Sequence, residues 1–156
     1  MSFIAGGYTA VWNSLSVGQI AAGSRITHQV FKRLISGDAY AESPQDGVYR
    51  GGEVVIGFTS LEYDAAAIQT IKWPYSATKW DLGTVGRTDV GSSLAKSLIF
   101  TAVAGTPAAA TPATMTFAKA ILHENFPVEV LYAPDLREVP LRMRVYPVAG
   151  ILGTET

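Results

Sequence analysis

The two histidines, His28 and His123, are the side chains best suited to acid–base or metal chemistry, but neither has the partner residues that such chemistry needs. Each lies in or at the end of a predicted strand, with no acid or second histidine at the spacing of a metal ligand. A zinc site requires three or four clustered ligands. We therefore expect structural or surface histidines, and no metal.

The carboxylates offer pairs but no specific pattern. Glu53 with Glu62, or Asp38 with Asp46, would in principle supply the two acids of a glycosidase. With 13 acids in 156 residues, however, some such pair is inevitable. The glycines at positions 51 and 52 do not form a phosphate-binding loop, and no nucleophile elbow occurs. We expect no enzymatic activity and no cofactor.

The arginines form the clearest charged group. Arg142 and Arg144 fall on the outward face of a predicted strand, with Arg137 nearby. Such a row can contact phosphate, but it more often protects an edge strand or pairs with acids of a neighbour. Twelve basic residues against 13 acidic ones leave a net charge of −1, which argues against a general nucleic-acid binder.

Composition points to a surface that is covered by other protein. The chain has no cysteine, which excludes disulfides, thiolate metal sites and cysteine nucleophiles. Hydrophobic residues make up 48%, and charged residues only 16% where about 25% is usual. Copies of the chain itself are the simplest covering partner.

No apolar stretch approaches the roughly 20 residues of a membrane span, and the N-terminus lacks the basic region of a signal peptide. We expect one domain over residues 1–156 and no membrane partner.

The hydrophobic pattern predicts a mainly β fold. Expected strands cover residues 8–12, 15–20, 25–35, 48–61, 96–103, 114–122, 126–132 and 139–146. Alternation places Val54, Ile56 and Phe58 on one face of their strand, and Val139, Leu141, Met143 and Val145 on the inward face of theirs. One helix is expected from an N-cap at Asp64 to Trp73, with Pro74 ending it. The sum favours a β-sandwich or partial barrel with one flanking helix.

Three further segments carry local predictions. Gly51 and Gly52 indicate a bulge or a close backbone approach within a strand. Residues 36–47 read as a long connection, where most hairpin loops have about 2–5 residues, so they invite a functional explanation. Residues 147–156 are expected to form a loose tail.

Charge is divided along the chain. No acid precedes Asp38, whereas six acids and only one base, Arg50, occur from Asp38 to Asp64. These blocks are suited to pairing within a subunit or between neighbours, but a solvated polar surface explains them equally well.

Several segments together resemble the tail tube (major tail) proteins of tailed bacteriophages. These are residues 5–18 (AGGYTAVWNSLSVG), Gly37-Asp38 with residues 46–52 (DGVYRGG), and the strands at 112–117 (PATMTF), 126–132 (FPVEVLY) and 139–146 (VPLRMRVY). The resemblance spans most of the chain. It lies in the order of segments and in short glycine-marked phrases, not in a catalytic motif.

The resemblance implies a structural protein of the virion tail, assembled in the cytoplasm of a bacterial host. Hexameric rings would stack into a hollow tube through which DNA passes transiently and without sequence specificity. Each subunit would give strands to a shared inner barrel, with the helix outside. Other tail and neck proteins would be further partners.

The resemblance also implies roles for individual residues. The connection that reaches the next ring corresponds to Ser36, Gly37, Asp38, Tyr40, Glu42, Pro44 and Asp46, and the N-terminal arm over residues 1–7 includes Phe3 and Ile4. Candidates for the lumen surface are Gln29, Glu53, Arg142 and Arg144. An acidic lumen would repel phosphates and let DNA slide, so positive charge brought there by Arg25, Arg33, Arg142 and Arg144 would depart from the family's preference.

Two alternatives remain open at this point. The chain is also compatible with another virion ring, such as a tail terminator or neck protein. A carbohydrate- or peptide-binding β-sandwich would instead use an aromatic cluster, for which the candidates are Trp12, Trp73, Tyr75 and Trp80. We favour a role for these aromatics at the helix–sheet junction.

Overall fold

The computed structural model describes residues 7–37, 43–75, 91–103, 113–132 and 137–156. Phe3 and Ile4 of the predicted arm, Asp38, Tyr40 and Glu42 of the predicted connection, and Trp80 lie outside these ranges.

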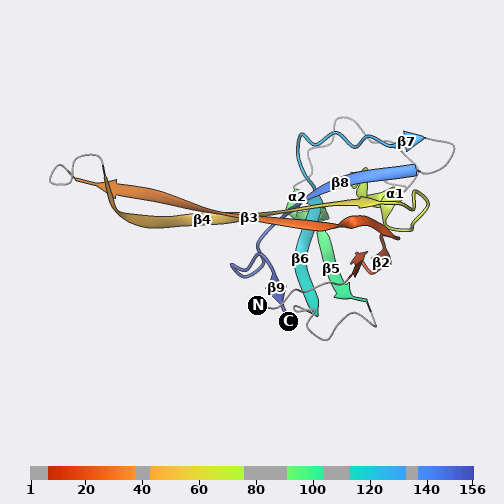
Figure 1. The fold of residues 1–156 in the computed structure, drawn as a ribbon, viewed down its shortest axis with the longest axis horizontal. Coiled ribbons are helices and arrows are strands. Elements are labelled where there is room, and N and C mark those ends of the chain that lie inside the picture. Colours follow the sequence, from red (N-terminus) through yellow and green to blue (C-terminus); the bar gives the residue numbers. More distant parts are fainter. Residues whose placement is uncertain (1–6, 38–42, 76–90, 104–112, 133–136) are drawn as a thin grey trace.

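The described strands form one large antiparallel sheet that is not closed into a barrel (Figure 1). Its order is β2-β1-β5-β6-β8-β4-β3, with β7 beside β8 and β9 beside β6. The strands are β1 (Tyr8–Trp12), β2 (Leu15–Ser16), β3 (Ile20–Ser36), β4 (Pro44–Ser60), β5 (Lys96–Ala102), β6 (Thr114–Leu122), β7 (Leu131–Tyr132), β8 (Arg137–Val145) and β9 (Thr154–Glu155). Two short helices, α1 (Ile68–Ile71) and α2 (Gly91–Leu94), complete the described elements. The prediction of a mainly β fold is confirmed.

The core lies on one face of a curled sheet. Every core-facing residue predicted for β8 is at most 4% exposed, and Val54, Ile56 and Phe58 of β4 are also buried. Phe58 of β4 meets Phe100 of β5 edge to face, with ring centroids 6.2 Å apart. Because β6 and β8 separate β4 from β5 in the sheet, this contact requires the sheet to curl until its inner face meets itself.

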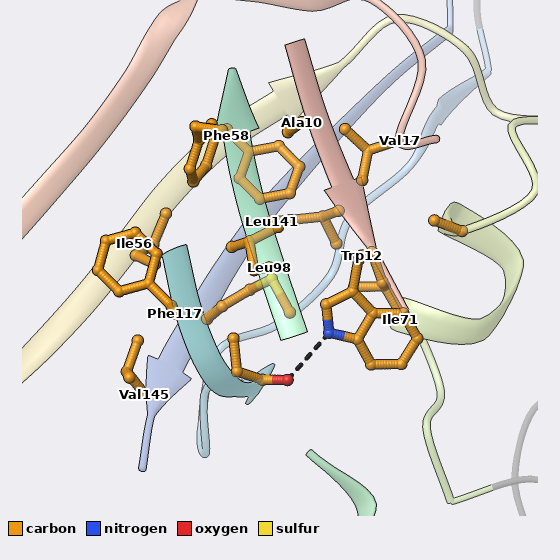
Figure 2. Packing of buried hydrophobic residues seen from close by; sticks show 14 of the residues in the cluster. Ala10, Trp12, Val17, Ile56, Phe58, Ile71, Leu98, Phe117, Leu141 and Val145 are labelled. Carbon is orange, nitrogen blue, oxygen red and sulfur yellow. Dashed lines mark hydrogen bonds between the residues drawn. The ribbon is translucent and has the colours of Figure 1, made fainter. Parts of the chain in front are cut away.

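Trp12 anchors the centre of this core (Figure 2). The residue is 2% exposed, and its indole Nε1–H donates to the carbonyl oxygen of Ala120 over 2.9 Å. The same cluster contains Ile71 of α1. A buried indole needs such a partner, so the hydrogen bond fixes β1 against β6 in one orientation.

The predicted helix over residues 64–73 is wrong in extent. Only Ile68–Ile71 is helical, its N-cap is Ala67, and that cap makes no side-chain hydrogen bond. In a helix with Asp64 as its N-cap, the Ala67 N–H would have no partner within the helix and would donate to the Asp64 side chain. Instead it donates to Ser16 at 3.2 Å, and the Tyr63 carbonyl accepts from the Gln69 side chain at 2.6 Å. Tertiary hydrogen bonds thus replace the first helical turn, while the helix ends before Pro74 as predicted.

The C-terminal segment is tied to the sheet, in contrast to the loose tail expected for residues 147–156. Ala149 and Gly150 both have positive φ angles and form a tight turn that bridges Val148 and Ile151. The chain then returns as β9 to pair with Met115 and Thr116 of β6. Residues 126–132 also differ from prediction, since only β7 is a strand there.

Candidate functional site

The β3–β4 hairpin extends far beyond the rest of the sheet and is the most distinctive feature of the fold (Figure 1). The two strands pair from Ile20 opposite Ser60 to Ser36 opposite Pro44. β8 covers β4 only from Val55 to Ser60. Residues 27–36 and 44–54 therefore form a ribbon that consists of only two strands for most of its length. We call this segment the ribbon.

The connection predicted over residues 36–47 is shorter than expected. Ser36 pairs with Pro44, Ile35 with Asp46 and Leu34 with Gly47, so four residues of the predicted connection belong to the strand ladder. Gly37 follows β3 directly. Pro44 is the first residue of β4, a position where the missing N–H of proline is tolerated. The prediction that Pro44 belongs to a loop is therefore wrong, because proline is also accepted at the start of a strand.

The predicted bulge in the ribbon is confirmed. Phe31 pairs with Gly51 and Lys32 with Tyr49, which leaves Arg50 as the extra residue. Gly51 has a φ of 122°, a conformation that other residues rarely adopt. A Cβ on Gly52 would lie 2.9 Å from the carbonyl oxygen of Gln29, so the strands approach closely there.

Large apolar side chains are exposed on both faces of the ribbon. Val30, Leu34 and Tyr49 continue the core-facing side and are 55%, 62% and 65% exposed. Phe31, Ile35 and Val48 lie on the opposite side and are also exposed. An isolated two-stranded hairpin is at best marginally stable in water. The ribbon thus offers two apolar faces and open edges to a partner.

The four residues predicted for the lumen surface come together on one face. We call the side of β3, β4 and β8 that points away from the core the outer face. Gln29 of β3 is opposite Glu53 of β4. Val55 lies two residues after Glu53 on β4 and is opposite Arg144 of β8. Gly57, the next outward position on β4, is opposite Arg142. The β3–β4 hairpin and β8, which is distant in sequence, therefore present these four side chains on one face.

Arg144 joins three elements through a charged cluster. Its Nη1 donates to Glu53 at 2.9 Å, and its Nε donates to Glu124 at 2.7 Å. Its Nη2 lies 3.1 Å from Nε2 of His123. A guanidinium group only donates, so this histidine nitrogen accepts, and the Nδ1–H donates to the Glu124 carbonyl at 2.6 Å.

The hydrogen bonds of the cluster shift the pKa values of Glu124 and Arg144. The hydrogen bond from Arg144 lowers the pKa of Glu124, and hydrogen bonds to Glu124 and Glu53 raise the pKa of Arg144. The roles of His123 and Glu124 were not predicted, because nothing in the sequence relates them to a residue 20 positions away.

The described aromatic candidates for a ligand site differ in their exposure. Trp12 is in the core, Trp73 is 41% exposed, and Tyr75 is partly buried. Trp12 packs in the same cluster as Ile71 of α1, which fits a role at the junction of helix and sheet.

Searches for other kinds of site and for relatives give the following results. Within the described ranges, no three His, Asp or Glu side chains gather as a metal site. No described helix combines the length and apolar character needed to cross a membrane. Comparison with models of known protein families finds no match, and comparison with curated proteins finds no similar chain.

Proposed function

We propose that this chain is a non-enzymatic structural subunit of a bacteriophage tail tube, which self-assembles into stacked hexameric rings around a channel for DNA. The observation that carries the proposal is the ribbon. Its apolar side chains are exposed, and among the described residues only two strands build most of its length. Such a surface is typical of a segment that becomes covered by assembly.

Open edges favour assembly through the sheet itself. β3 is the last strand of the sheet, and its outer edge has no strand partner among the described residues. In the proposed ring, neighbouring subunits would complete a sandwich or barrel that one subunit leaves open. A head-to-tail contact closes into a ring when its rotation divides a full turn, and rings then stack.

In this arrangement the channel surface would include Gln29, Glu53 and Arg144 of the outer face, whereas Arg142, the fourth lumen candidate, would be covered by a neighbouring copy. The ion pairs of Arg144 with Glu53 and Glu124 support this placement. They offset positive charge that would otherwise bind phosphates and slow the passage of DNA. The N-terminal arm with Phe3 and Ile4, and the connection after β3, would contact the adjacent ring.

The test is the assembly state of the purified chain, measured by sedimentation and negative-stain electron microscopy over a range of concentrations and salt. We expect rings and hollow tubes. A monodisperse monomer at high concentration under every condition would refute the proposal. Assembly that stops at one or two rings would instead support a tail terminator or neck protein, which is the second candidate.

A further inference from the structure

Two arginines flank a glycine on the outer face. Arg25 of β3 is opposite Gly57 of β4, and Gly57 is opposite Arg142 of β8. With neighbouring strands about 4.8 Å apart, the two arginine Cα atoms are roughly 10 Å apart, with no side chain between them. We call this arrangement the arginine notch.

The space over the notch is open. Arg25, Gly57 and Arg142 line a groove of about 900 Å³, together with Ser24 and Phe126. A Cβ on Gly57 would meet nothing nearer than the carbonyl oxygen of Leu141 at 4.0 Å. The hydroxyl oxygen of Ser24 is buried without a hydrogen-bond partner. The groove therefore has room for a side chain of a partner.

The notch also carries positive charge that the described part of the subunit does not neutralise. Arg144 lies two residues after Arg142 on the same face of β8, and it forms ion pairs with Glu53 and Glu124. Arg25 and Arg142 are exposed and make no ion pair within the described residues. Guanidinium groups in this situation are suited to bind a carboxylate or a phosphate in bidentate fashion.

The charge distribution of the chain favours a carboxylate of another copy. Asp46 is exposed at the far end of the ribbon, on the outer side like the notch. One of its carboxylate oxygens accepts from the Gly47 N–H at 2.7 Å, and the other has no partner within the described residues. Asp46 belongs to the acid-rich block of the sequence, and a net charge of −1 does not favour nucleic acid as the partner.

A subunit cannot make this contact with itself. Gly57 lies 11 positions after Asp46 on β4, which corresponds to roughly 36 Å of extended strand. The ribbon runs away from the body of the subunit along this length and does not fold back (Figure 1). A contact between Asp46 and the notch must therefore join two copies.

We propose that the arginine notch of one subunit receives Asp46 from the ribbon of a second copy of this chain. The inference rests on the proposed self-assembly and specifies its contact.

Charge reversal tests the pairing. Asp46→Lys alone, and Arg25→Asp with Arg142→Asp, each place like charges against one another. Each should raise the critical concentration for assembly by more than about tenfold, because juxtaposed like charges are strongly unfavourable. All three changes in one chain should restore assembly, and so should an equimolar mixture of the two reversed proteins. Lys96→Asp, a charge reversal at an exposed position of β5, is the control and should have little effect.

A second variant tests the notch without replacing either arginine. Gly57→Glu supplies a carboxylate between them and should block assembly to a similar extent. The unfolding midpoint of every variant, measured below the assembly concentration, checks that the subunit remains folded.

The outcomes separate this inference from the proposed function. If the unchanged chain does not assemble, both fail. If it assembles, and the reversed variants do so at an unchanged critical concentration, the notch contact is refuted while the proposed function stands. Failure of the triple variant to assemble, although folded, refutes Asp46 as the occupant. Loss of DNA binding in the arginine variants, with normal assembly of Asp46→Lys, would show a phosphate site and also overturn the inference.

Discussion

Replacing Leu34 with alanine separates the stability of the subunit from the stability of the assembly. Leu34 is on the ribbon and is 62% exposed, so its side chain contributes little to the folded subunit. If another copy covers the ribbon, the change removes three carbon atoms from the new contact. At about 0.8 kcal/mol per carbon, scaled by the exposed fraction, the loss is about 1.5 kcal/mol per contact. That corresponds to about a tenfold weaker association.

The matched control is the same substitution in the core. Leu98 is 0% exposed, and Leu98→Ala should lower the free energy of unfolding by about 2–5 kcal/mol. Urea unfolding of dilute protein measures the stability of the subunit, and pelleting over a concentration series measures the critical concentration for assembly. We expect Leu34→Ala to change only the second quantity by about tenfold.

Two results would refute the reasoning. An unchanged critical concentration for Leu34→Ala would mean that copies do not cover this side of the ribbon. A loss of subunit stability similar to that of Leu98→Ala would mean that Leu34 is already buried within the subunit.

Two further predictions concern the ribbon backbone and the charged cluster. Gly52→Ala should speed amide exchange across the β3–β4 ladder, because the added Cβ would lie 2.9 Å from the Gln29 carbonyl oxygen. Gly57→Ala is the control and should leave the exchange rates unchanged, because the nearest neighbour of its Cβ is 4.0 Å away. Equal exchange rates in the two variants would contradict this prediction. Arg144→Gln should return the pKa of Glu124 toward 4.5, as measured by NMR titration, and no change would refute the assigned hydrogen bond. Because folding lowers this pKa, the ion pair stabilises the protein fully above the unfolded value of 4.5, and the contribution is lost as the pH falls through the folded value. Acid unfolding of the variant should lack this loss.

The sequence determined the features that depend only on near neighbours in the chain. Side chains alternate across any extended strand, so the inward positions of β8 and β4 follow from the pattern alone. Gly51 and Gly52 indicated the bulge because glycine relieves a local steric restriction. The resemblance to tail tube proteins likewise comes from local phrases, and it remains a proposal.

Only the tertiary structure decided which distant residues meet. Arg144 is 91 residues from Glu53, and the arginine notch requires the registers of three strands at once. The predicted helix lost its first turn because Ser16, far away in sequence, accepts the Ala67 N–H. Pro44 read as a loop residue, yet continued pairing with β3 made it part of the ribbon. In each case the deciding interaction is a long-range hydrogen bond or strand register, and local sequence preferences carry no information about either.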